Sequence, residues 1–253
     1  MSLRACSCDV LSRTANRKEG LLPASPRGPS PHRPFRGGKF TLLRVREIYT
    51  RTVNLEEPES GRRYSVVTSE EDFGPRTWLT DLLPPLRQGE LLSLPVQDVP
   101  VQYDPSLPAG RMNPRWVPLV YEWNSLLEEE LEPLAAPARE RRFGDLLGLG
   151  PGSTPAGDDF LAGYTTGRLW LGTPVPPLPD TSRTTWLSAE ILRDAADGLV
   201  WKRSKDVLES LSLNDPAALL KAVERILGWG HTSGRAWLAG LSAAVSDTIE
   251  RNV

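Results

Sequence analysis

The sequence predicts an α+β protein, in which a β-rich N-terminal domain packs on a mainly helical C-terminal domain. Two patterns lead to this prediction: apolar and polar residues alternate in the first half of the chain, and apolar residues recur every three or four positions in the second half. The 253 residues, 39% of them hydrophobic, are enough for one large or two modest domains with a buried core. We expect a tail over 1–38, the β-rich domain over 39–112 and the helical domain over 113–253.

The tail is rich in proline and arginine and has hardly any apolar periodicity, which predicts a disordered or weakly ordered segment. Its composition resembles that of a transit peptide, and a mis-assigned start or a cloning remnant explains it equally well. The two cysteines of the chain, Cys6 and Cys8, are too close together for a useful disulfide, and we interpret them as incidental thiols.

Alternating segments rich in β-branched residues predict strands over 40–54 and 63–68, and two short strands over 89–103 that proline interrupts. Beyond Asn113 the apolar spacing becomes helical. The first helical stripe consists of Trp116, Leu119, Val120, Trp123, Leu126, Leu127 and Leu131. Four further helices are expected over 155–171, 184–199, 215–228 and 233–249.

Charge and hydropathy argue against two classes of partner. The net charge of −2 gives no general attraction to nucleic acid or to a membrane, and no apolar run approaches the roughly eighteen residues of a membrane-spanning helix. The basic cluster over 201–205 is short and isolated, so nucleic-acid binding is not expected. These features predict a cytoplasmic protein.

The run over 148–163 combines a glycine-rich loop, a helix-start signal and two acids, and it is the main candidate site. Thr154 and Pro155 are typical of an N-cap and of a first helical residue. Because a helix start offers unpaired N–H groups and a partial positive charge, the loop predicts an anion site. A plain packing turn is the alternative, and the spacing fits neither a P-loop nor a dinucleotide-binding motif. The expected anion ligands are Gly150, Gly152, Ser153, Thr154 and Gly157.

Asp158 and Asp159 are expected in the first turns of this helix, where the helix dipole alone favours carboxylates. Since successive helical residues point about 100° apart, the two acids cannot serve one surface. One of them could face a pocket, as a Mg²⁺ ligand, as a hydrogen-bond acceptor for a substrate amide or as a general base, while the other orients the loop.

The motif recurs imperfectly 77 positions later, where residues 234–240 repeat the pattern of 157–163 and both copies end in Ala-Gly. Glycine inside a helix costs about 1 kcal/mol relative to alanine, so its use in both helices indicates that their backbones pack closely. If the helices cross there, their N-termini could converge on one pocket. Close packing without a pocket is the alternative.

The second helix start adds further candidates. His231 stands at its entrance as a candidate catalytic residue, although a lone histidine in such a place is more often structural. Thr232 and Ser233 are typical capping residues and are expected to join the anion ligands. Arg235 could hold a carboxylate or phosphate through two parallel hydrogen bonds, or could pair with one of the two acids.

These motifs resemble a bacterial family that includes the smallest subunit of oxamate carbamoyltransferase, from anaerobic allantoin degradation. The resemblance lies in the sequence GPGSTPAGDDFLAG over 150–163, and it is supported by 51–55, by Gly74-Pro75 and by 230–240. It implies a subunit that acts with two larger proteins to exchange a carbamoyl group between oxalurate and phosphate, which yields oxamate and carbamoyl phosphate. Arg235 departs from the family pattern, which tends to show an acidic residue shortly after the glycine.

Three functions are therefore compared. The first is a carbamoyltransferase-type subunit that binds a small anionic or amide substrate, with Asp158, Asp159 and His231 as catalytic candidates. The second is a non-catalytic accessory subunit that docks a catalytic partner. The third is an independent hydrolase that uses Mg²⁺ held by Asp158 or Asp159.

Overall fold

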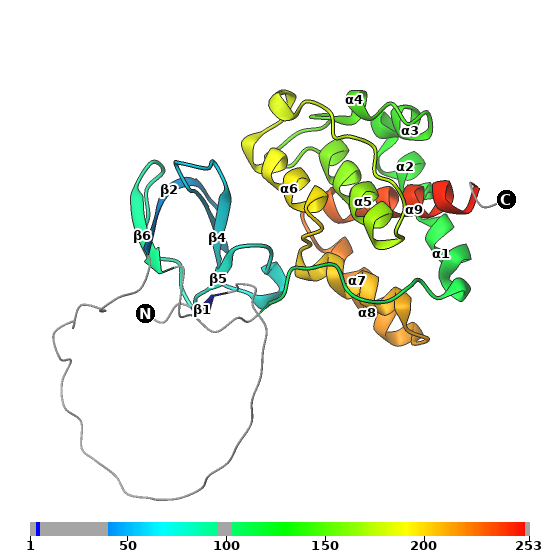
Figure 1. The fold of residues 1–253 in the computed structure, drawn as a ribbon, viewed down its shortest axis with the longest axis horizontal. Helices are drawn as coiled ribbons and strands as arrows, with labels where there is room; N and C mark the ends of the chain where they lie inside the picture. The colour runs from blue at the N-terminus through cyan, green and yellow to red at the C-terminus, as the bar shows by residue number, and fades with distance from the viewer. Residues whose placement is uncertain (1–3, 6–39, 96–102, 251–253) are drawn as a thin grey trace, which may run out of the picture.

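The structure, a computed structural model, describes residues 4–5, 40–95 and 103–250. Figure 1 shows a curved sheet beside a larger body of helices, which confirms the α+β prediction. Both cysteines and most of the expected tail lie outside the described residues. The strands β1 to β6 are Arg4–Ala5, Phe40–Ile48, Thr52–Glu56, Arg63–Val67, Thr77–Leu79 and Leu91–Pro95.

The sheet has the strand order β1-β5-β4-β3-β2-β6, and of these neighbours only β4 and β5 run parallel. The long strand predicted over 40–54 is in fact a hairpin, in which β2 and β3 are joined by a turn at 49–51. One of the two strands expected over 89–103 is present as β6, and residues 96–102 lie outside the described residues. Strand β5 has three residues, too few for an alternation to reveal.

Nine α-helices follow the sheet in the described part of the chain. Helices α1 to α9 are Val117–Glu122, Ser125–Glu129, Glu132–Arg139, Phe143–Leu146, Ala156–Trp170, Trp186–Ala196, Lys202–Ser212, Pro216–Leu227 and Ser233–Glu250. None of these helices is both long enough and apolar enough to cross a membrane. Short 3₁₀ turns precede or connect them at Glu70–Asp72, Pro114–Trp116 and Thr181–Arg183.

The four helices expected after the glycine loop correspond to α5, α6, α8 and α9. The first apolar stripe is not one helix, because the chain turns at Trp123 and Asn124 and separates α1 from α2. Helix α7 has no clear sequence signal, since its first turn is polar and its buried apolar residues, Val207, Leu208 and Leu211, are confined to its second half.

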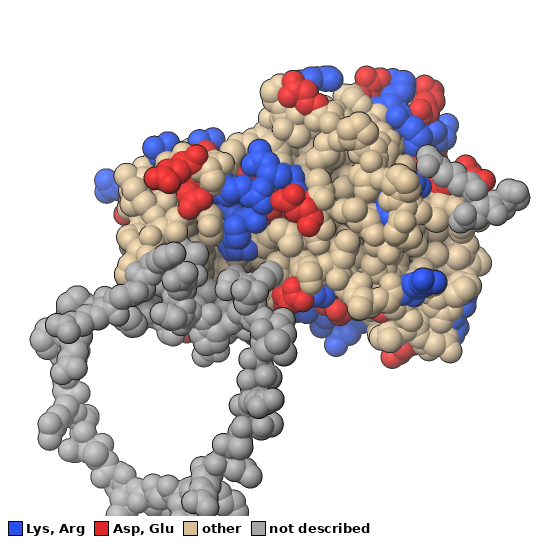
Figure 2. Space-filling view, in the orientation of Figure 1, with Lys and Arg blue, Asp and Glu red and all other residues tan. Residues whose placement is uncertain are grey.

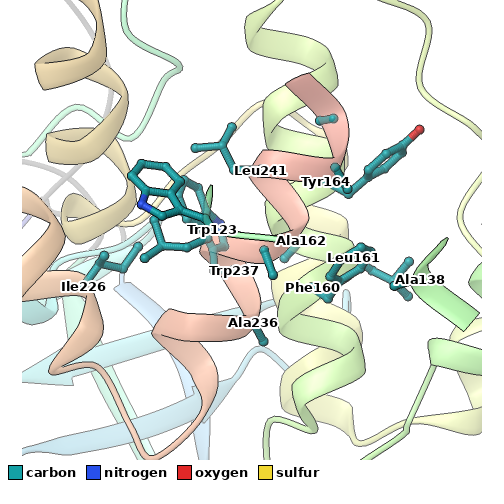
Figure 3. Close-up of a cluster of buried hydrophobic side chains, with 14 of the residues drawn as sticks. Trp123, Ala138, Phe160, Leu161, Ala162, Tyr164, Ile226, Ala236, Trp237 and Leu241 are labelled. Carbon is teal, nitrogen blue, oxygen red and sulfur yellow. The ribbon is translucent and has the colours of Figure 1, made fainter. Parts of the chain in front are cut away.

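Helices α5 and α9 form the centre of the helical part, where Figure 3 shows their apolar side chains meeting. A Cβ atom added to Gly163 would fall well inside van der Waals contact with the Trp237 carbonyl oxygen, and one added to Gly240 would do the same at Phe160. Gly163 faces Trp237, and Gly167, one turn later in α5, faces Ala244, which is also later in α9. The two helices therefore run in the same direction. The predicted close approach of the two helices is confirmed.

Buried ionic contacts join the sheet to the helices. Arg63 on β4 is fully buried, and its guanidinium lies 3.0 Å from a carboxylate oxygen of Asp194 on α6. Arg62 and Arg76 also pair with Asp194, so three arginines of the sheet meet at one buried acid. Figure 2 shows basic side chains gathered where the sheet meets the helices.

A second contact lies beside the first. Trp201, the residue before α7, packs its indole against Gly74, where an added Cβ would lie 2.8 Å from the ring. Arg203 on α7 then pairs with Asp72 on the sheet side at 3.1 Å. The sheet is thus held in one position relative to the helices by close contacts that tolerate little change.

We expect Gly163→Ala to lower the free energy of unfolding by about 1–3 kcal/mol, because the added methyl group must push the backbones of α5 and α9 apart. Gly144→Ala on α4 is the matched control, since a Cβ there meets nothing within 4 Å and alanine favours the helix. Denaturant unfolding measures both. Equal stability of the two variants would contradict the close approach.

We expect Asp194→Asn to lower the free energy of unfolding by about 3–5 kcal/mol, because it leaves the buried charge of Arg63 without its acid. Asp197→Asn removes an acid that is half exposed and pairs with Arg62 on the surface, and its effect should stay within about 0.5 kcal/mol. Denaturant unfolding of both variants provides the comparison. If the two cost the same, Asp194 is not what holds the sheet in place.

Candidate functional site

A cavity of about 380 Å³ lies where the sheet meets the helices. Its sheet side is formed by the β2–β3 turn with Tyr49 and Arg51, and its helix side by the starts of α5 and α9. Two tryptophans, Trp201 and Trp229, line its wall. The cavity therefore collects residues from both halves of the chain.

The first glycine loop contributes Ser153 and Thr154 to this cavity. Helix α5 begins at Ala156 with Pro155 as its N-cap and no side-chain cap, so the expectation that Thr154 caps the helix is wrong. The Thr154 hydroxyl instead lies 3.4 Å from the Ser233 hydroxyl of the second loop. The two helix starts converge, as the repeated motif predicts.

The second loop repeats the local architecture of the first. The Gly157 N–H donates to the carbonyl of Leu149 at 2.9 Å, and the Gly234 N–H donates to that of Trp229 at 3.1 Å. A Cβ on either glycine would collide with a carbonyl of the preceding helix, at Leu146 and at Ile226. Both N–H groups are therefore used within the fold rather than directed at the cavity.

Asp158 holds the first loop in place. Its carboxylate accepts a hydrogen bond from the Gly148 N–H at 2.8 Å and another from the Thr184 hydroxyl. Arg235, at the equivalent position of the second motif, donates to the carbonyls of Leu227 and His231 and pairs with Glu130. Each side chain thus binds the backbone of its own loop, and Arg235 is not among the residues that line the cavity.

Asp159 is in a different environment. Its side chain is buried, and its Oδ2 atom has no hydrogen-bond partner. Burial raises the pKa of Asp159 well above its usual range, which outweighs the lowering by a hydrogen bond with Ser233. Asp159 lines a small, largely enclosed cavity of about 10 Å³, together with Trp201, Trp229 and Trp237.

Of the other predicted site residues, some line the large cavity and others do not. Ser233 lines the large cavity with Ser153 and Thr154, whereas His231 is exposed and lies outside its lining. Gly150 and Gly152 have positive φ angles of 118° and 94°, which supports the tight loop, and they too lie outside the lining, as does Thr232. Their roles as ligands stay predictions.

The predicted Mg²⁺ role of Asp158 or Asp159 gains no support from the geometry. Asp158 already accepts two hydrogen bonds. Over the ranges 4–5, 40–95 and 103–250, no three His, Cys, Asp or Glu side chains cluster as metal ligands would. Two ligands at most would come from this pair of acids.

Three cavity residues carry chemistry that sequence reasoning did not assign. Arg51, in the β2–β3 turn, brings a cationic group with a side chain that is 57% exposed. Asp72 pairs with it at 3.3 Å. Trp201 lines both cavities. Arg51 belongs to the 51–55 run that supports the family resemblance, so a sequence signal existed without a reason to place it near the loops.

Comparisons with known proteins give one match. Residues 146–245, which include both glycine loops, match the family model described as oxamate carbamoyltransferase subunit AllH. No curated protein and no solved structure matches the chain. The match confirms the resemblance that the two motifs carry.

We expect the two neighbouring acids to respond oppositely to substitution. Asp158→Ala leaves the Gly148 N–H without its acceptor and should lower the free energy of unfolding by about 1–3 kcal/mol. Asp159→Asn removes a carboxyl that burial destabilises when it is ionised, so it should be neutral or stabilising at pH 7. Denaturant unfolding of both variants measures this contrast.

The pH dependence of the stability difference between the wild type and Asp159→Asn tests whether the raised pKa is its cause. Because the pKa of Asp159 is raised in the folded state, its contribution to stability is complete below the usual aspartate pKa and is lost as the pH rises toward the folded value. The free energy of unfolding of Asp159→Asn should therefore rise relative to that of the wild type as the pH increases from about 4. A difference independent of pH would show that Asp159 is ionised in the folded protein at no cost.

Proposed function

We propose that this chain, which belongs to the family of oxamate carbamoyltransferase subunit AllH through residues 146–245, supplies a substrate-binding cavity to a carbamoyltransferase complex. One observation carries the proposal: the matched segment contains both glycine loops, and their Thr154 and Ser233 hydroxyls meet at the wall of a single cavity.

The proposed reaction is the exchange that the family resemblance implies. A phosphate oxygen attacks the terminal carbamoyl carbon of oxalurate, and the bond from that carbon to the internal nitrogen breaks. The phosphate proton moves to this nitrogen. The products are carbamoyl phosphate and oxamate, so atoms and charge balance.

The cavity offers groups that suit these anions. The hydroxyls of Ser153, Thr154 and Ser233 can donate hydrogen bonds to phosphate or carboxylate oxygens, and Arg51 adds a positive charge. The N–H groups of Gly157 and Gly234 are already bonded within the fold, so side chains carry much of the proposed binding. Placement in the cytoplasm remains part of the proposal.

Two larger subunits are the proposed partners, and the sheet offers a surface on which one could dock. Phe40 and Leu42 on β2 and Leu91 on β6 are each about half exposed. The strand register pairs Leu42 with Ser93 and Arg44 with Leu91, so these apolar side chains lie on one face. Exposed apolar patches of this kind are typical of interaction sites. The accessory role would use the same surface.

The experiment is reconstitution of the full chain with the two larger subunits of the complex, followed by an assay of carbamoyl transfer. Ser233→Ala removes the hydroxyl that meets Thr154 and Asp159, and we expect turnover to fall about tenfold or more because one substrate hydrogen bond is lost. Ser60→Ala, in an exposed turn of the sheet, is the matched control and should retain full activity.

Assembly of the complex, followed by size-exclusion chromatography, separates the alternatives. Normal assembly with reduced turnover in Ser233→Ala supports the cavity as the substrate site. Full turnover in this variant would remove the cavity from the reaction. Loss of assembly would favour the accessory role, and turnover by the isolated chain with Mg²⁺ would favour the hydrolase.

A further inference from the structure

The enclosed cavity beside Asp159 holds polar groups that the fold leaves unpaired. Asp159 is 3% exposed, yet its Oδ2 atom has no hydrogen-bond partner. The Nε1–H group of Trp201 is also buried without a partner. Unpaired buried polar atoms cost free energy, and in a native protein they call for a ligand or a role. The two residues that carry these unpaired groups, one an acceptor and one a donor, line the same space.

The enclosed cavity adjoins the large one. Ile191, Trp201 and Trp229 line both, so they form the boundary between the two spaces. Ser233 links them as well, because it lines the large cavity and its side chain bonds to Asp159. The enclosed space, about 10 Å³, has room for about one water molecule, and an –NH₂ group is of similar size.

Arg51 lines the large cavity from its sheet side. Its partner, Asp72, is also bound by Arg203, whose Nη2 atom lies 3.1 Å from Oδ1. One carboxylate therefore faces two guanidinium groups, and Arg51 keeps a positive charge that a second anion can share. Since more than half of its side chain is exposed, the cation is accessible from the cavity.

We propose that the two cavities form one site for a short anionic amide or ureide, whose –NH₂ group enters the enclosed space at Asp159 and whose carboxylate lies toward Arg51. This inference rests on the proposed function, because the carbamoyltransferase substrates are molecules of this class. The ligand N–H donates to Asp159 Oδ2, and the carbonyl next to it accepts from the Trp201 Nε1–H. In oxalurate this carbonyl carbon is the one that phosphate attacks, and it remains at the boundary, open to a reactant in the large cavity.

The chemistry of the enclosed space selects an amide over the other small ligands. An ionised carboxylate has only acceptor oxygens and no N–H donor, so it cannot pair with Asp159 Oδ2 as an acceptor. A metal ion would need several more ligands than Asp159 supplies, and no group of three His, Cys, Asp or Glu side chains that could hold one occurs in the described residues. An amide presents a donor and an acceptor side by side, which matches the two unpaired groups.

The test measures binding of oxamate, oxalurate and oxalate to the full chain by calorimetry, with the fluorescence of the cavity tryptophans as a second readout. Oxamate and oxalurate should bind more tightly than oxalate. Asp159→Leu, which fills a similar volume without a polar atom, should weaken both amides about tenfold or more. Asp159→Asn serves as a second variant, because an asparagine can turn its amide oxygen toward the ligand and should retain part of the affinity.

Two further variants complete the design. Arg51→Gln should weaken all three anions, because it removes the charge that binds their carboxylates. Asp197→Asn, on the surface of the neighbouring helix, should bind like the wild type. The proposal is overturned if Asp159→Leu, folded as judged by its unfolding transition, binds oxamate as the wild type does. Equal affinity for oxalate and oxamate, or no binding of either amide at millimolar concentration, overturns it too.

The reconstituted complex separates this inference from the function on which it rests. If the wild-type complex transfers carbamoyl groups and Asp159→Leu does so equally well, the amide subsite is wrong and the function stands. If amide binding depends on Asp159 but no complex transfers a carbamoyl group, the function is wrong and the subsite stands.

Discussion

The contact between α5 and α9 is the constraint on which the rest of the structure depends. Gly163 and Gly240 allow the two backbones to touch, and a Cβ atom at either position would collide with the facing backbone. Because the helices run in the same direction, this contact fixes their starts side by side, with Thr154 and Ser233 within 3.4 Å. Without it, the two loops would line separate surfaces. Glycine at the crossing of the two helices thus brings their starts together around one cavity.

The two loops share an architecture and differ in charge, and the geometry explains the difference. Asp158 accepts a hydrogen bond from a loop N–H, whereas Arg235 donates to loop carbonyls. A negative side chain and a positive side chain therefore both hold their loop in place, because the backbone offers a donor in one loop and acceptors in the other. The same likeness extends to the preceding helices, where the sequence LLGLG over 146–150 corresponds to ILGWG over 226–230.

The sequence predicts the helical half of the site well and the sheet half poorly. The repeated Ala-Gly pattern is local, so it reveals both the helix starts and their close approach. Arg51 reaches the cavity only because β4 and the turns after it are fixed to α6 and α7 by contacts between residues more than a hundred positions apart, such as Arg63 with Asp194. Such contacts leave no periodic signal. Neither does the difference in hydrogen bonding between two adjacent buried acids, which depends on which groups of the fold lie beside each of them.

Asp72 shows why the sheet and the site cannot be separated. It binds Arg203 of α7 and Arg51 of the β2–β3 turn with the same carboxylate, so the cation in the cavity wall is positioned by an acid that the helices themselves hold. A shift of the sheet would move Arg51 and expose the Trp201 ring, which lies against Gly74 and beneath Arg63. The buried charges at the junction need not add stability in sum, because desolvation offsets much of their attraction. Their directional geometry sets how far the cation lies from the buried acid, and that distance decides which ligands can span the cavity.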